Sequence, residues 1–300
     1  MSAAFRLEPF DKLRGAPVED PTADFDRTTS PKLIVTDLDG TFLSPDGSVS
    51  EQNAAAVAAA QAAGIPVLFA TGRPVRWLDV IRDLPGAHPT VIASNGAALY
   101  DLGAGELVDR ICIDPEIALA AVRRVREVVP DASFAFESGT RFGYEPAYRT
   151  WPVDDGTDPA LYRGPAEEVA ISEEFVKMLV QSQSVRPDDL LDIVRVEVGK
   201  TLTATHSQTR DFGLVEISAA GVTKASMLRR FCARLGIDGR QVAAFGDMPN
   251  DVDMLSSVGM PHVVANAHPA LRALNFPVVP SNVDSGVGRT IMGLLSPVPT

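Results

Sequence analysis

The sequence predicts an α/β fold, in which a Rossmann-like domain with a parallel sheet carries a smaller α+β domain as an insert. Three observations predict it. Short apolar segments alternate with helical segments toward both ends of the chain, which is the pattern of βα units. From about Ala98 to Ala219, the strands instead follow one another as in hairpins. Polar residues come directly after several apolar segments, where open α/β sheets bind their ligands.

The first part of the chain supplies alternating strands and helices. Three short apolar runs that end at polar loops are predicted to be strands, at 32–36, 66–70 and 90–93. A helix is predicted over 50–63, because Ser50 caps its start and Gly64 follows its end.

The middle of the chain has a different pattern. Leu99-Tyr100 and residues 107–113 flank a glycine-rich turn, which predicts a hairpin. Beyond it, helices are expected at about 115–129 and 188–198, and strands at 133–136, 176–180, 201–205 and 214–218. The proline-rich stretch up to Gly164 is predicted to be a loop.

The βα pattern then returns, with a helix over 223–235 and strands at 242–245, 262–264 and 278–279. The sequence thus divides into a flexible N-terminal extension (1–30), a core domain (31–97 and 220–300) and an inserted cap domain (98–219).

Composition narrows the function classes. A formal net charge of -12 argues against a nucleic-acid partner, which would be bound by clustered Lys and Arg. No apolar run approaches the ~18 residues of a membrane helix, and the charged first 30 residues do not resemble a secretory signal. Cys112 and Cys232 are expected to be ordinary thiols of a reducing compartment. The predicted location is therefore the cytoplasm.

The clearest chemical signal is Asp37-Leu38-Asp39-Gly40-Thr41, directly after the first apolar strand. Asp37 and Asp39 can both face the crevice beyond the strand end, where one carboxylate can attack and the other can exchange protons. The alternative is an Asp-Gly turn with solvated carboxylates.

Three further motifs follow the same rule. Thr71-Gly72 comes after the second strand, where a hydroxyl and backbone amides can bind a phosphoryl group, although a helix cap is an equal alternative. Lys224 opens a helix, where a cation is unfavourable for stability, so a role at an anion site is indicated, although a solvated surface lysine is an equal alternative. Asp247 follows a later strand, with Asn250 and Asp251 close behind, so that Asp37 and Asp247 can reach one hard cation. The histidines (His88, His206, His262 and His268) are scattered without the spacing of metal ligands and are expected to be ordinary.

Together, these motifs resemble the haloacid dehalogenase (HAD) superfamily of phosphotransferases. The large insert resembles the C2-type cap of its Cof-type branch, subfamily IIB. Further resemblance lies in Ser94-Asn95-Gly96-Ala97, in Glu216-Ile217-Ser218 and in Asn266-Ala267-His268-Pro269.

The resemblance implies a role for each motif residue. Asp37 would be the nucleophile that forms an aspartyl-phosphate, Asp39 the acid and base, and Lys224 the charge-balancing cation. The phosphate would be bound by four residues, which are Thr71, Gly72, Asn95 and Asn250. Mg²⁺ would be the cofactor, bound through Asp37, Asp39, Asp247 and Asp251.

The expected activity is a Mg²⁺-dependent phosphatase acting on small phosphorylated metabolites, with sugar phosphates preferred, as a monomer or small homo-oligomer. A phosphosugar mutase is the alternative, because mutases of the superfamily also use both carboxylates. A third hypothesis is a binding or regulatory protein on the same scaffold. The presence of Asp37, Asp39, Thr71, Lys224 and Asp247 argues against it. In the cap, Glu137, Arg141 and Arg149 are either specificity contacts or a solvated charged face.

Overall fold

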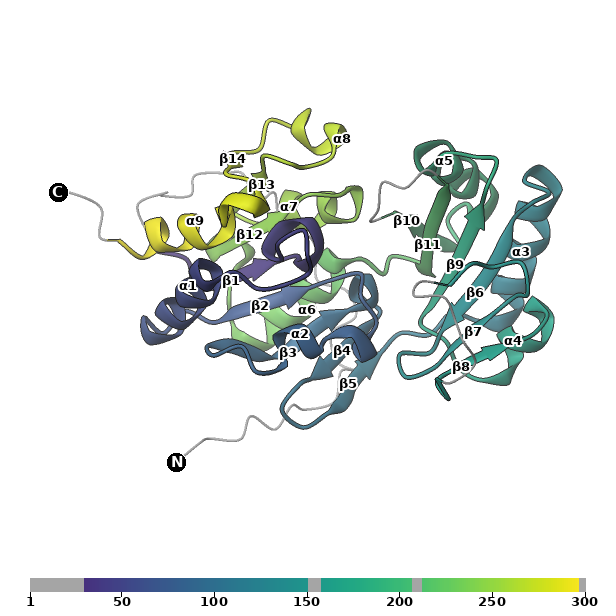
Figure 1. The fold of residues 1–300 in the computed structure, drawn as a ribbon, viewed down its shortest axis with the longest axis horizontal. Helices are drawn as coiled ribbons and strands as arrows, with labels where there is room; N and C mark the ends of the chain where they lie inside the picture. The colour runs from purple at the N-terminus through teal and green to yellow at the C-terminus, as the bar shows by residue number, and fades with distance from the viewer. Residues whose placement is uncertain (1–29, 151–157, 207–211, 297–300) are drawn as a thin grey trace.

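The computed structural model describes residues 30–150, 158–206 and 212–296. The predicted N-terminal extension therefore lies outside the described residues, apart from Ser30. The described chain forms two sheets that lie side by side, each covered by its own helices (Figure 1). The predicted fold class, a parallel-rich α/β domain with an α+β insert, is confirmed.

The first sheet has eight strands. In spatial order they are β14 (Val278–Val279), β13 (Met260–Val264), β12 (Val242–Gly246), β1 (Leu33–Thr36), β2 (Val67–Ala70), β3 (Ala87–Ala93), β4 (Ala98–Asp101) and β5 (Glu106–Arg110). The strands from β14 to β3 pair in parallel, whereas β4 and β5 pair antiparallel. Every residue of β1, β2 and β12 is buried, as expected for parallel strands covered on both faces.

Helices cover both faces of this sheet. α1 (Glu51–Ala62) packs against α9 (Gly286–Leu295), while α6 (Lys224–Leu235) lies behind the sheet in Figure 1 and packs against α7 (Val252–Ser256). α2 (Asp79–Arg82) and α8 (Pro269–Arg272) are shorter still, with four residues each. None of the helices in the described part of the chain combines the length and the apolar character needed to cross a bilayer.

The second sheet has six strands. In spatial order they are β10 (Leu202–Thr205), β11 (Gly213–Ala219), β9 (Lys177–Ser182), β6 (Ser133–Glu137), β7 (Phe142–Tyr144) and β8 (Leu161–Arg163). Its helices are α3 (Pro115–Val128), α4 (Ala166–Ser172) and α5 (Pro187–Val198). Strands and helices here share a separate hydrophobic cluster. We call residues 115–219 the cap and the part built on the first sheet the core.

Two features differ from the sequence analysis. The stretch predicted as a loop up to Gly164 contains β7 and β8, and α4 begins just beyond it; β7 and β8 pair in parallel. The predicted hairpin is present, but it joins the first sheet through β3, and Leu99 and Leu102 lie in the core's hydrophobic cluster. We therefore propose that the cap begins after β5, rather than at residue 98.

Candidate active site

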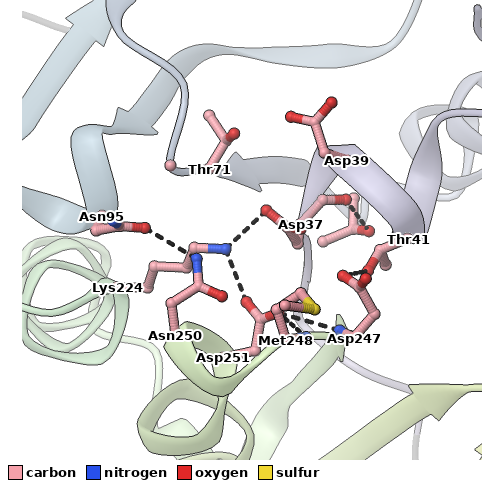
Figure 2. Close-up of polar contacts among 12 residues, drawn as sticks. Asp37, Asp39, Thr41, Thr71, Asn95, Lys224, Asp247, Met248, Asn250 and Asp251 are labelled. Atoms are coloured by element: carbon pink, nitrogen blue, oxygen red, sulfur yellow. Dashed lines mark hydrogen bonds and ion pairs between the residues drawn. The ribbon is translucent and has the colours of Figure 1, made fainter. Parts of the chain in front are cut away.

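The carboxyl ends of β1, β2 and β12 meet at one edge of the first sheet, since β1 pairs in parallel with both neighbours. This edge brings together Asp37, Thr71 and Asp247, which directly follow the three strands (Figure 2). All three are buried. The Asp37 N–H donates to the Phe245 carbonyl (3.0 Å), so the parallel ladder continues into the site.

Lys224 enters the same site from the start of α6. Thr223 caps this helix in a capping box with Ser226, which places Lys224 at its first residue. The Lys224 Nζ lies 2.7 Å from Asp37 Oδ1 and 2.7 Å from Asp251 Oδ1, and its side chain is fully buried. The start of α6 comes this close because Gly96 has no side chain: a Cβ there would lie 2.2 Å from the Thr223 carbonyl oxygen.

The loop after β12 is tied to the turn after β1. Thr41 Oγ1 donates to Asp247 Oδ1 (2.7 Å). Gly40 has a φ of +76°, and a Cβ there would lie 2.3 Å from Asp247 Oδ2. Asp251 Oδ2 accepts the backbone N–H groups of Asp247 and Met248 (3.0 and 3.1 Å), which holds the loop closed. The predicted Asp-Gly-Thr turn is thus one wall of the site.

Burial of several carboxylates around one lysine shifts their proton affinity. Burial raises the pKa of Asp37 to about 7, an effect that Lys224 only partly offsets. Burial, together with the charges of Asp37 and Asp251, raises the pKa of Asp247 well above its usual value. Burial opposes the charged form of Lys224, but Asp251 and Asp37 raise its pKa overall. When Asp37 and Asp247 are ionised, the described side chains therefore do not fully compensate their negative charge.

This uncompensated charge suits a hard cation. Carboxylate oxygens of Asp37, Asp247 and Asp251 all lie within 4.8 Å of one another. Among the hydrogen bonds of the described residues, both Asp251 oxygens have donors, whereas Asp37 Oδ2 and Asp247 Oδ2 have none. Oxygen ligands from one or two carboxylates are typical of Mg²⁺. The set fits a divalent cation, with Asp37 and Asp247 as its carboxylates and Asp251 orienting the loop.

Asp39 lies apart from this cluster. Its carboxylate is half-exposed and, in Figure 2, points away from Lys224. Arg73 binds both of its oxygens, through Nε (2.7 Å) and Nη2 (2.6 Å), while Arg73 Nη1 donates to the Trp77 carbonyl (3.1 Å). A bidentate arginine holds a carboxylate in a defined plane. Sequence reasoning missed Arg73, although its position directly after Thr71-Gly72 was a usable signal.

Thr71 is buried, and its hydroxyl already has one partner within the loop. The Arg73 N–H donates to Thr71 Oγ1 (3.0 Å), which leaves the hydroxyl proton to be donated elsewhere. The Asn95 N–H donates to the Thr71 carbonyl (3.0 Å). The loop after β2 is thereby joined to the loop after β3.

The Asn95 and Asn250 side chains bind each other instead of lying free. Asn250 Nδ2 donates to Asn95 Oδ1 (2.9 Å), and Asn95 Nδ2 donates to Glu216 of the cap. Asn95 has a φ of +56° and its neighbour Ser94 a φ of +49°, strained values that cluster at functional sites. With its amide donating to Glu216 and its carbonyl accepting from Asn250, Asn95 joins the core to the cap.

The three charged cap residues singled out by sequence have different surroundings. Glu137 is buried and pairs with Arg76 of the core. Arg141 stacks on the Tyr162 ring (4.5 Å to the ring centroid) and is half-exposed. The Arg149 backbone exchanges hydrogen bonds with the Gln181 side chain (3.0 and 2.8 Å).

Two histidines expected to be unrelated meet between cap and core. Asp188 Oδ1 lies 2.8 Å from His206 Nε2, and Asp188 Oδ2 lies 3.7 Å from His268 Nε2. This group has the composition of a metal site. However, His268 Nδ1 accepts the Ala270 N–H (3.2 Å), so a neutral His268 carries its proton on Nε2, facing Asp188. The arrangement is that of a polar bridge between cap and core.

Comparisons with known proteins agree with this geometry. A family model described as haloacid dehalogenase-like hydrolase matches residues 34–291. Phosphatase YwpJ of Bacillus subtilis is 27% identical over 289 residues, covering 88% of this chain and 100% of the relative. A second Bacillus subtilis protein, 5-amino-6-(5-phospho-D-ribitylamino)uracil phosphatase YcsE, is 23% identical over 262 residues, covering 87% and 94%.

The fold is also shared with solved structures. The HAD subclass IIB sugar phosphatase BT4131 superposes with a TM-score of 0.72 at 19% identity, covering 88% of this chain and 100% of that one. Because the match covers 88% of this chain, it extends over the core and into the cap.

Proposed function

The chain belongs to the haloacid dehalogenase-like hydrolase family and is a hydrolase of its phosphatase type; from this premise we propose that it is a Mg²⁺-dependent phosphatase of small phosphorylated metabolites, with sugar phosphates as the preferred class. The observation that carries the proposal is the ion pair of Lys224 with Asp37 and Asp251, beside Asp37 Oδ2 and Asp247 Oδ2, which accept no hydrogen bond from the part of the chain that the structure describes. This arrangement can balance the charge of a phosphoryl group at a nucleophilic carboxylate. The sugar-phosphate preference rests on the resemblance to subclass IIB.

The first half of the proposed reaction uses Asp37 as the nucleophile. An Asp37 oxygen attacks phosphorus, the bond from phosphorus to the leaving oxygen breaks, and Asp39 supplies a proton to that oxygen. The product is an alcohol and an aspartyl-phosphate. Lys224 offsets negative charge on Asp37 and on the transferred group throughout.

The second half consumes water. Asp39, now ionised, takes a proton from a water molecule that attacks phosphorus, and the bond to Asp37 breaks to release inorganic phosphate. Mg²⁺, when bound by Asp37, Asp247 and the Asp39 backbone carbonyl, would supply positive charge to the phosphoryl oxygens. Thr71 Oγ1 can donate its free proton to a phosphoryl oxygen, with the Gly72 amide beside it.

Asp39 must leave Arg73 for part of this cycle. In the described arrangement both of its oxygens accept from the Arg73 guanidinium, whereas proton transfer needs an oxygen that faces the leaving group or the attacking water. We therefore expect the Asp39 side chain to rotate away from Arg73 when the leaving group arrives.

The test is phosphate release from a panel of phosphorylated metabolites, with Mg²⁺ and with excess chelator. Wild-type protein is expected to release phosphate only with the cation, and Asp37→Asn is expected to abolish release while it keeps the fold. Isomer formation stimulated by a sugar bisphosphate, without net phosphate, would instead identify a mutase. Absence of both activities, with no binding of inorganic phosphate, would contradict the proposed function.

A further inference from the structure

One face of the cap sheet carries charged side chains where it meets the core. Alternate residues of the central strands, among them Phe136, Met178 and Ile217, pack against the cap helices. Their strand neighbours therefore face the other way, and they include Glu137 and Lys177, which are register partners on β6 and β9. Glu216 on β11 belongs to the same face. We call Glu137, Lys177 and Glu216 the charged row.

Each member of the charged row contacts a core loop at the active site. Glu137 accepts a hydrogen bond from the Arg76 guanidinium, and Glu216 accepts one from Asn95 Nδ2. Between them, Lys177 Nζ donates to the Gly72 carbonyl (2.7 Å) and lies 3.4 Å from Glu216 Oε2. The cap carboxylates of Glu137 and Glu216 thus accept from core side chains, whereas the Lys177 ammonium donates to a core carbonyl.

The alternating polarity defines one docking position of the cap. Glu137, Lys177 and Glu216 are at most 5% exposed, so each needs a partner to compensate its lost hydration. A shift along the sheet would place like groups opposite one another and leave a buried charge unpaired. The docked arrangement therefore selects the register in which Lys177 reaches Gly72.

The Lys177 contact reaches the phosphate site through one peptide plane. The Gly72 carbonyl and the Arg73 N–H belong to the same planar trans peptide and point in opposite directions. Lys177 holds the carbonyl end, and the N–H end donates to Thr71 Oγ1 (3.0 Å). With one lone pair of Oγ1 occupied in this way, the Thr71 hydroxyl proton is directed to a different acceptor.

We propose that Lys177 is a positioning residue of the active site, which fixes the Gly72–Arg73 peptide and so aims the Thr71 hydroxyl at a bound phosphoryl group when the cap docks. This inference rests on the proposed function. It assigns to the cap a role in phosphoryl binding as well as in choosing the leaving group. Lys177 is not a substrate contact in this scheme, because its ammonium is buried and already has two partners.

A double-mutant cycle tests the coupling. Lys177→Met, Thr71→Val and the double variant are compared for affinity toward inorganic phosphate with Mg²⁺, by calorimetry, and for KM and kcat. Loss of one hydrogen bond to a charged group predicts about tenfold or more weaker phosphate binding in each single variant. Because Lys177 acts through Thr71, the double variant should bind phosphate no more weakly than Thr71→Val alone.

Lys200→Met is the matched control, since it removes a lysine from an exposed position of the cap that has no part in the charged row. It should leave phosphate affinity within about twofold of wild type. For Lys177→Met, the rise in KM should be the same for substrates with different leaving groups, and the Mg²⁺-induced shift in Tm should be unchanged.

Other results would overturn the inference. Additive losses in the cycle would mean that Lys177 acts independently of Thr71, and a KM effect confined to one leaving group would make Lys177 a substrate contact. Equal losses of phosphate and Mg²⁺ binding would show a purely structural role. Failure of the wild-type protein to bind phosphate at all would instead count against the proposed function.

Discussion

The ammonium of Lys224 lies 2.7 Å from a carboxylate oxygen of Asp37, although the two residues are 187 positions apart in the chain. One belongs to the end of a buried strand and the other to the first turn of α6. The position is costly for a lysine by itself, because it faces the positive end of the helix dipole. Asp37 and Asp251 offset that cost. The core segment before the cap, with Asp37, and the core segment after it, with Lys224, therefore balance each other's charge.

The first prediction concerns Lys224→Met. Removal of one partner from a buried ion pair leaves carboxylates uncompensated and should lower the free energy of unfolding by about 3–5 kcal/mol without a cation. Loss of charge at the reacting centre should reduce kcat by about 10²–10³-fold. Chemical denaturation and steady-state kinetics measure the two effects. Lys200→Met, at an exposed position in the cap, is the control and should change neither.

The second prediction concerns pH. In the cation-free protein the pKa of Asp37 is about 7, against 3.8 for its ordinary value. At a pH between 3.8 and about 7, Asp37 keeps its proton in the folded protein, whereas it has lost that proton in the unfolded chain. This group's contribution to stability therefore falls as pH rises through that window, by at most about 1.4 kcal/mol per pH unit.

A divalent cation needs the ionised carboxylates and should reverse this loss. The Mg²⁺-induced rise in Tm is expected to be larger at about pH 8 than at about pH 5.5, because protons compete for the same oxygens. Thermal unfolding with and without Mg²⁺ at both pH values checks this. A shift of the same size at the acid pH would mean that Mg²⁺ binds elsewhere.

The third prediction separates backbone strain from a local clash. Gly40 (φ +76°) and Gly47 (φ +81°) have similar left-handed backbones, but only at Gly40 would a Cβ meet Asp247, 2.3 Å from its Oδ2. The left-handed backbone alone should cost an alanine about 1–2 kcal/mol of stability at either position, and the clash at Gly40 adds to that cost. Only Gly40→Ala should also weaken Mg²⁺ binding and phosphatase activity, since it displaces a proposed cation ligand. Equal activity of the two variants would contradict the role given to Asp247.

The fourth prediction concerns Arg73 and Asp39. Asp39→Asn should slow hydrolysis of alkyl phosphates by about 10²–10⁴-fold and that of aryl phosphates less, because a phenolate leaves with less help from an acid. Arg73→Lys keeps the charge but loses the two parallel hydrogen bonds. It should show the same dependence on the leaving group, to a smaller degree. Kinetics on a matched series of esters provides the measurement, and uniform losses across the series would argue against an acid–base role.

The sequence by itself determined much of the core and of the site. Strands such as β1 and β12 are continuous apolar runs, and a parallel sheet brings their carboxyl ends to one edge whatever else the chain does. Asp37 and Asp247 were therefore expected at one edge of the sheet, and the pairing of β1 with β12 places them side by side. Lys224 could be singled out because a lysine at a helix start conflicts with local stability.

Other features were decided only by tertiary structure, because they depend on contacts between segments without a local signal. The local sequence of the β4–β5 hairpin does not show to which domain it belongs; the pairing of β4 with β3 decides this. Similarly, β7 is too short to be recognised within a proline-rich stretch. Likewise, the Arg73 partner of Asp39 and the Lys177 partner of Gly72 arise where separate loops and the cap are packed together. Composition and spacing identify the reacting groups, whereas packing determines which way they point.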